Sequence, residues 1–157
     1  MWTCHRIALG SGDGTAALHV AEDRCCSSLL ETEERHLVTV PNSRYVGVEE
    51  VRVSRLDSIA PTLFDGERLY LKLDVQGGEL GALRGSVETL HRTEAIEVEL
   101  SLVSLYRGAP AYEEVIAWLA DRGFRLATLD AGFESAHTGE MLQFDGIFVR
   151  SAAPEGS

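Results

Sequence analysis

The stretch LYLKLDVQGGELGALRG, residues 69–85, decides the fold class that this sequence predicts. In its first half apolar residues alternate with polar ones, so a β-strand over 69–75 is expected to place Lys72 and Asp74 on one face. Gly77-Gly78 then favours a tight turn, because glycine adopts backbone conformations that other residues avoid. Apolar residues at helical spacing follow directly: Leu80, Leu83, Val87 and Leu90. A strand that turns at once into an amphipathic helix indicates an α/β fold.

The rest of the sequence predicts more strands and helices. Strands are expected over 4–10, 15–21, 48–59, 95–100, 124–129 and 145–150, and helices over 79–91 and 110–123. Gly85-Ser86 is expected to interrupt the first helix, with Ser86 as the N-cap of its second part. Residues 21–47 are polar and irregular. The alternation of strands and helices in the second half predicts an α/β layer architecture with a mainly parallel sheet.

Length, charge and cysteine content limit the classes of function. A chain of 157 residues with 45% hydrophobic residues suffices for one domain, expected over 1–150 and followed by a disordered tail over 151–157. The net charge of −11 argues against nucleic acid and against an anionic membrane as partners. The three cysteines show no C-x-x-C spacing and predict no disulfide framework. Together these properties predict a soluble, cytoplasmic protein.

The glycine-rich segment GSGDG, residues 10–14, has two interpretations. A glycine-rich loop after a strand can mark a nucleotide or dinucleotide site, but such a site requires a helix to follow. Here the next segment alternates like a strand, and Asp13-Gly14 is a strong hairpin signal. We therefore expect a β-hairpin at this position.

The polar residues at the end of the 69–75 strand are the first candidate site. Ligands of open α/β sheets bind beyond the carboxyl ends of the strands, where Asp74 is expected to lie. The alternative is a structural Lys72–Asp74 ion pair at the sheet edge, with Glu79 merely favoured by the positive end of the helix dipole. The residues by themselves leave both interpretations open.

A metal site has less support. Glu97 and Glu99 share one face of the 95–100 strand, and Glu99 beside Asp74 could form a carboxylate pair for a hard cation. Alternating polar residues are, however, common on a half-exposed strand. The five histidines show no ligand spacing. We predict no metal site.

Four segments resemble, in order and spacing, the C-terminal part of FkbM-type S-adenosylmethionine-dependent methyltransferases. They are LKLDVQGGELGALRG, IEVELSLVSLYRG, YEEVIAWLADRGF and LQFDGIFVR, and the similarity extends from about residue 8 to residue 150. The most specific part is the K-x-D-x-Q-G-x-E pattern of residues 72–79.

The resemblance implies a Rossmann-like class I methyltransferase sheet with the strand order 3-2-1-4-5-7-6, in which 69–75 is the fourth strand. The last two strands of such a sheet run antiparallel. One sheet should then contain the strands 69–75, 95–100, 124–129 and 145–150. The two helices should pack on it through Leu80, Leu83, Val115, Ile116 and Leu119.

The resemblance also implies a reaction and its residues. S-adenosylmethionine would be the methyl donor, and the acceptor would be a small molecule with a hydroxyl group, such as a sugar or another natural product. Asp74 would be the catalytic base or orienting group, Lys72 would hold it by an ion pair, and Glu79 would shape the turn and contact substrate. Ser11, Asp74 and Gln76 would contact the cofactor.

The sequence departs from the family pattern at its N-terminal end, where the first strand and its glycine-rich loop are not found. We therefore expect an N-terminally incomplete methyltransferase sheet with exposed edges, weak or no binding of S-adenosylmethionine, and possible self-association through those edges. The alternative function is a non-catalytic remnant that acts as a binding or interaction module.

Overall fold

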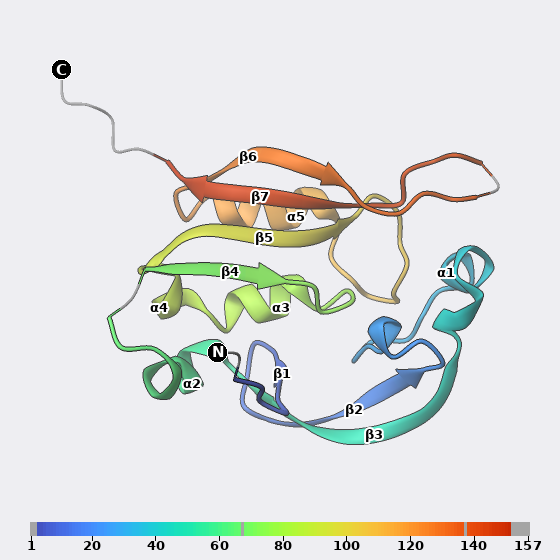
Figure 1. Cartoon of the computed structure of the whole chain (residues 1–157), viewed down its shortest axis with the longest axis horizontal. Coiled ribbons are helices and arrows are strands. Elements are labelled where there is room, and N and C mark those ends of the chain that lie inside the picture. The colour runs from blue at the N-terminus through green and yellow to red at the C-terminus, as the bar shows by residue number, and fades with distance from the viewer. Residues whose placement is uncertain (1–2, 67, 137, 152–157) are drawn as a thin grey trace.

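Four strands form the larger of two sheets in the computed structural model, which describes residues 3–66, 68–136 and 138–151 (Figure 1). Strand β4 is parallel to β5, and β7 is antiparallel to both β5 and β6. In spatial order the strands are β4 (Leu69–Leu73), β5 (Thr93–Ser101), β7 (Gln143–Arg150) and β6 (Phe124–Ala131). The predictions that these segments share one sheet, and that its last two strands are antiparallel, are confirmed.

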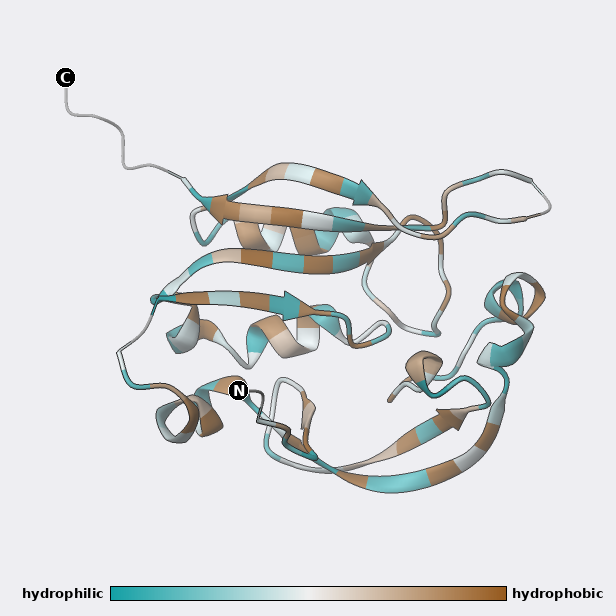
Figure 2. Cartoon of the chain, viewed as in Figure 1, coloured by the Kyte–Doolittle hydropathy of each residue, from teal (hydrophilic) through white to brown (hydrophobic). Residues whose placement is uncertain are grey.

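The helices of the second half pack on one face of this sheet. They are α3 (Glu79–Arg84), α4 (Val87–Leu90) and α5 (Tyr112–Ala120). The predicted contact residues Leu80, Leu83, Val115 and Leu119 are buried, and Ile116 packs partly buried against the same core. The ribbon of β5 alternates between hydrophobic and hydrophilic residues in Figure 2, because one face of the strand meets these helices while the other is polar.

The predicted break between α3 and α4 is present at Gly85-Ser86, and Ser86 occupies the N-cap position of α4. A Cβ atom at Gly85 would lie 2.0 Å from the carbonyl oxygen of Gly10, so only glycine allows this close approach. Ser86 does not cap α4 with its side chain, since its hydroxyl donates to the carbonyl of Ala82 at 2.6 Å. Asp57 accepts instead from two backbone N–H groups of α4, those of Glu88 (3.1 Å) and Thr89 (2.8 Å).

The smaller sheet has the order β1-β3-β2. Its strands are β1 (Ala8–Leu9), β2 (Gly14–Ala21) and β3 (Tyr45–Ser54). Because β1 and β2 lie on opposite sides of β3, the predicted hairpin at residues 10–14 is wrong. The side chain of Asp13 accepts instead from the hydroxyl groups of Ser54 (2.5 Å) and Ser58 (2.7 Å). These bonds fix the loop to the end of β3 rather than to a hairpin partner.

The segment 48–59, predicted as a strand, continues as β3 only to Ser54 and then becomes helix α2 (Leu56–Leu63). The backbone N–H of Arg55, which precedes this helix, donates to Asp13 at 2.9 Å. The segment expected to be irregular contains three short helices: η1 (Arg24–Cys26), α1 (Glu34–Thr39) and η2 (Pro41–Ser43).

A single Rossmann-like sheet is not confirmed, because the described residues form two separate sheets. What the structure shows is a mixed α/β fold with the strand order β4-β5-β7-β6. Of the predicted disordered tail, all but Ser151 lies outside the described residues, and the backbone N–H of Ser151 donates to the carbonyl of Gly123 at 2.7 Å. Within the described ranges we find no helix that is long and apolar enough to cross a membrane.

Candidate functional site

The loop that follows β4 has an unusual backbone. Gln76 has a φ of +54°, a left-handed conformation that residues other than glycine rarely adopt, and Gly77 follows with a φ of +93°. A Cβ atom on Gly77 would lie 3.0 Å from Tyr106 Cβ and 3.1 Å from Leu30 Cδ1, so this position needs glycine for space as well. Such strained conformations cost free energy and persist only where the surrounding structure determines them.

Gln76 is fixed by hydrogen bonds to residues from three other parts of the chain. Its side-chain nitrogen donates to Asp74 Oδ1 at 2.7 Å and to Glu99 Oε2 at 3.0 Å. Its side-chain oxygen accepts from the hydroxyl of Tyr106, and its backbone carbonyl accepts from Ser28 Oγ at 2.7 Å. We call Asp74, Gln76, Glu99 and Tyr106 the Gln76 cluster.

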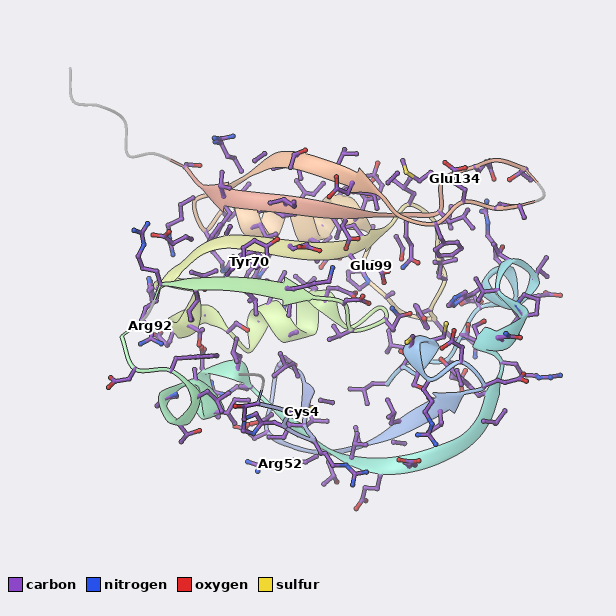
Figure 3. The ribbon with its side chains drawn as sticks, in the orientation of Figure 1. Cys4, Arg52, Tyr70, Arg92, Glu99 and Glu134 are labelled. Carbon is purple, nitrogen blue, oxygen red and sulfur yellow. The ribbon has the colours of Figure 1, made fainter. Side chains whose placement is uncertain are left out.

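Glu99 is the electrostatically unusual member of the Gln76 cluster. It lies near the carboxyl end of β5, as Figure 3 shows, and directly opposite Asp145 on β7. Burial raises the pKa of Glu99 to about 8, with further contributions from the negative charges of Asp74, Glu79 and Asp145. Asp145 in turn lies opposite Asp130 on β6, so a row of carboxyl groups crosses the sheet. Glu99 therefore gives up its proton less readily than an ordinary glutamate.

Lys72 does not form the predicted ion pair with Asp74. Its ammonium group contacts Glu97, its partner in the β4–β5 register, and lies 3.5 Å from Asp145. The hydrogen bond with Glu97 raises the pKa of Lys72 and lowers that of Glu97. The prediction failed because the carboxylates that Lys72 contacts come from two other strands of the sheet, β5 and β7. A sequence pattern within one strand does not reveal such contacts.

Glu79 is buried at the start of α3, inside the turn that follows β4. Its Oε1 accepts from the backbone N–H groups of Val75 and Gly77, both at 3.1 Å. Burial raises the pKa of Glu79, although these backbone hydrogen bonds oppose the shift. The side chain thus holds the turn in shape, in line with the first role expected for it.

A cleft of about 600 Å³ adjoins the Gln76 cluster. Three backbone segments form much of its wall: the loop from Gly10 to Gly14, the turn at Gly77-Gly78, and residues 108–111 before α5. Ser11 lines this cleft, whereas Asp74 and Gln76 do not, although Gln76 directly precedes the turn in the wall. The structure therefore brings Asp74, Gln76 and Glu79 together and places Ser11 in the neighbouring cleft.

The described residues hold no group of three or more histidine, cysteine, aspartate or glutamate side chains arranged to bind a metal ion. In the Gln76 cluster, one oxygen of each carboxyl group accepts from the same amide. The amide of Gln76 therefore links the two carboxyl groups.

Two residues of the site were not identified from the sequence. Ser28 and Tyr106 reach Gln76 from 48 and 30 residues away along the chain. No spacing rule links these positions, because the contact depends on how the two loops fold back on β4. Glu99 was noted, but as a possible cation ligand and not as a proton-holding group.

One comparison with known proteins places the chain in a family. The model of the family described as Methyltransferase FkbM domain matches residues 2–126, which include the K-x-D-x-Q-G-x-E pattern, Glu99 and Tyr106. No curated protein and no solved structure matches the chain. Because the family match covers most of the sequence, this chain belongs to the FkbM methyltransferase family.

Proposed function

We propose that this chain transfers the methyl group of S-adenosylmethionine to a hydroxyl oxygen of a small-molecule acceptor, of the kind found in sugars and other natural products. The observation that carries this proposal is the position of Asp74 at the carboxyl end of β4, held by Gln76, whose chain neighbour Gly77 lines a cleft of about 600 Å³. Family membership supports methyl transfer in general. The identity of donor and acceptor is our inference.

Asp74 has the chemistry that an oxygen acceptor requires. A hydroxyl oxygen becomes a better nucleophile as its proton is removed, and a positioned carboxylate can accept that proton. Gln76 binds Oδ1 of Asp74 at 2.7 Å, which leaves Oδ2 for the acceptor hydroxyl. Asp74 is exposed, so it can afterwards release the proton to water.

The cleft suits an extended, polar ligand such as S-adenosylmethionine. Its volume lies within the usual range of small-molecule sites, about 300–1,000 Å³. Added Cβ atoms at Gly12, Gly14 and Gly108 would meet nothing within 4 Å, so the backbone of these residues is open to a ligand. Ser11 would contribute a hydroxyl group to the same wall. When bound, S-adenosylmethionine would supply a methyl group activated by a positively charged sulfur.

The other predicted site residues receive supporting roles in this proposal. Gln76 orients Asp74 instead of contacting the cofactor, because its amide is already engaged with Asp74, Glu99 and Tyr106. Glu79 holds the turn. Lys72 reduces the repulsion between Glu97 and the row of carboxyl groups on the open face of the sheet.

The Asp74→Asn variant tests the role of the carboxylate. Asparagine keeps the hydrogen bond with Gln76 but is a far weaker base, so we expect transfer of labelled methyl from S-adenosylmethionine to hydroxyl acceptors to fall about 10²–10⁴-fold. The melting temperature should stay close to that of the wild type. Asp130→Asn removes the same charge from exposed Asp130 on β6 and is the matched control. An unchanged transfer rate in Asp74→Asn would refute the assignment.

A second candidate function is a binding module that acts through its sheet edge. It is favoured by the position of β4, which lies at one end of the order β4-β5-β7-β6. Edge strands offer unpaired backbone groups to a further strand. This hypothesis predicts concentration-dependent self-association in sedimentation experiments together with no methyl transfer. Transfer that depends on Asp74 would exclude it as the main function.

A further inference from the structure

Two carboxyl groups of the Gln76 cluster share one amide group. The side-chain nitrogen of Gln76 donates one hydrogen to Asp74 Oδ1 at 2.7 Å and the other to Glu99 Oε2 at 3.0 Å. The remaining polar atom of the amide, its oxygen, lies against Tyr106. The hydroxyl of Tyr106 donates to that oxygen and fixes the orientation. Asp74 and Glu99 are therefore held at a constant separation.

The surroundings of the two carboxyl groups differ. Asp74 is exposed, whereas Glu99 is half-buried between several elements. The acidic groups that act on Glu99 are Asp74 after β4, Glu79 from α3 and Asp145 from β7. Cys26 of η1 and Tyr106 also lie within electrostatic range. Lys72, the nearby cation, contacts Glu97 and Asp145 instead.

These surroundings assign the proton to Glu99. Burial and three neighbouring carboxyl groups disfavour its charged form, while its contact with Gln143 only partly opposes this effect.

We propose that Glu99 holds a proton at neutral pH and is a positioning residue, which lets the Gln76 amide keep Asp74 oriented toward the acceptor. The consequence for catalysis rests on the proposed function, but the proton on Glu99 can be measured without any activity.

The role in methyl transfer follows from the balance of charges. As the acceptor oxygen forms a bond to the methyl carbon, the carbon–sulfur bond breaks and its electron pair stays on sulfur. The hydroxyl proton passes to Asp74. The carboxyl pair then changes from one negative charge to none. If Glu99 were also ionised, the pair would begin with two negative charges held together by a single amide, and their repulsion would displace Asp74 from its position.

Carbon NMR of the full chain with labelled carboxyl groups tests the proposal directly. We expect Glu99 to titrate near pH 8 in the wild type and at least one pH unit lower in Asp74→Asn. Asp130→Asn, the matched control, should leave the midpoint of Glu99 within a few tenths of a unit. A wild-type midpoint between about pH 4 and 5, or a midpoint that Asp74→Asn leaves unchanged, would overturn the proposal.

The pH profile of methyl transfer separates this inference from the proposed function. The rate of the wild type should change near pH 8, and this change should be absent in Glu99→Gln. If Glu99 had only a structural role, the wild type and the variant would have pH profiles of the same shape. If the chain transfers no methyl group but Glu99 titrates as expected, the proposed function fails while the assignment of the proton to Glu99 stands. If methyl transfer depends on Asp74 but Glu99 has an ordinary midpoint, the function stands and this inference fails.

Discussion

Gln76 combines a left-handed backbone with a fully engaged side chain. A φ of +54° is unfavourable for glutamine, yet four hydrogen bonds hold it there, three of them with distant parts of the chain. Strain of this kind is typical of positions where geometry matters more than stability. At Gln76 the result is that two carboxyl groups meet at the end of the sheet and one of them, Asp74, faces solvent.

The raised pKa of Glu99 has a consequence for folding. An unfolded glutamate loses its proton near pH 4.5, whereas folded Glu99 keeps it up to about pH 8, so the folded state binds more protons within that window. Stability should therefore fall as the pH rises from about 4.5 to about 8, by up to roughly 1.4 kcal/mol per pH unit. Glu79 acts in the same direction, since burial raises its pKa too.

The Glu99→Gln variant isolates this contribution in denaturation curves measured at several pH values. His36 opposes the effect, because burial lowers its pKa and its charging destabilises the fold toward acid pH. Because His36 is present in both proteins, its contribution to stability cancels when Glu99→Gln is compared with the wild type. We expect the variant to gain stability relative to the wild type as the pH rises from 4.5 to 8. A constant difference across this range would mean that Glu99 is ionised in the folded state.

At the scale of the elements, the β4–α3 connection depends on one glycine. Gly77→Ala would force a side chain into a left-handed conformation and against Tyr106 and Leu30, so we expect a loss of about 1–3 kcal/mol in the free energy of unfolding. Gly81 is the matched control. It lies within α3 with nothing within 4 Å of an added Cβ, so Gly81→Ala should stabilise by about 0.5–1 kcal/mol.

In chemical denaturation, Gly77→Ala should lower the free energy of unfolding and Gly81→Ala should raise it. If both variants changed it in the same direction, or if Gly77→Ala left it unchanged, the turn would be able to adopt another conformation.

The strand–turn–helix unit at 69–85 could be predicted because its signals are local. Alternation, the glycine pair and the helical spacing each act over a few residues. The loop at residues 10–14 shows the limit of such signals. Asp13-Gly14 is a typical hairpin sequence, but Asp13 bonds to Ser54, Arg55 and Ser58, which lie about 40 residues away. Nothing within the loop reveals those partners.

The candidate site was predictable to the same extent. Asp74, Gln76 and Glu79 could be identified because they follow one strand and match one family pattern. The partners of Lys72 and the contacts of Ser28 and Tyr106 depend on strand order and on loops that meet in space. Pattern analysis along one chain does not contain that information.

In the whole molecule, the candidate cleft lies where separate segments approach one another. The loop from Gly10 to Gly14 belongs to the smaller sheet, while Gly77-Gly78 follows a strand of the larger one. The close contact between Gly10 and Gly85 joins the first of these loops to the helical layer of the larger sheet. A ligand in the cleft would therefore contact parts of both sheets.

Titration of the isotopically labelled chain with S-adenosylmethionine, followed by amide NMR, is the sharpest test of the proposed donor site, because it detects binding even at millimolar affinity. We expect shifts concentrated at backbone N–H groups of the cleft wall, those of Ser11, Gly12, Gly78 and Gly108. Amides in the β6–β7 pair, which do not line the cleft, should remain unchanged. No shifts at saturating donor, or shifts confined to residues outside the cleft, would contradict the assignment of this cleft as the methyl-donor site.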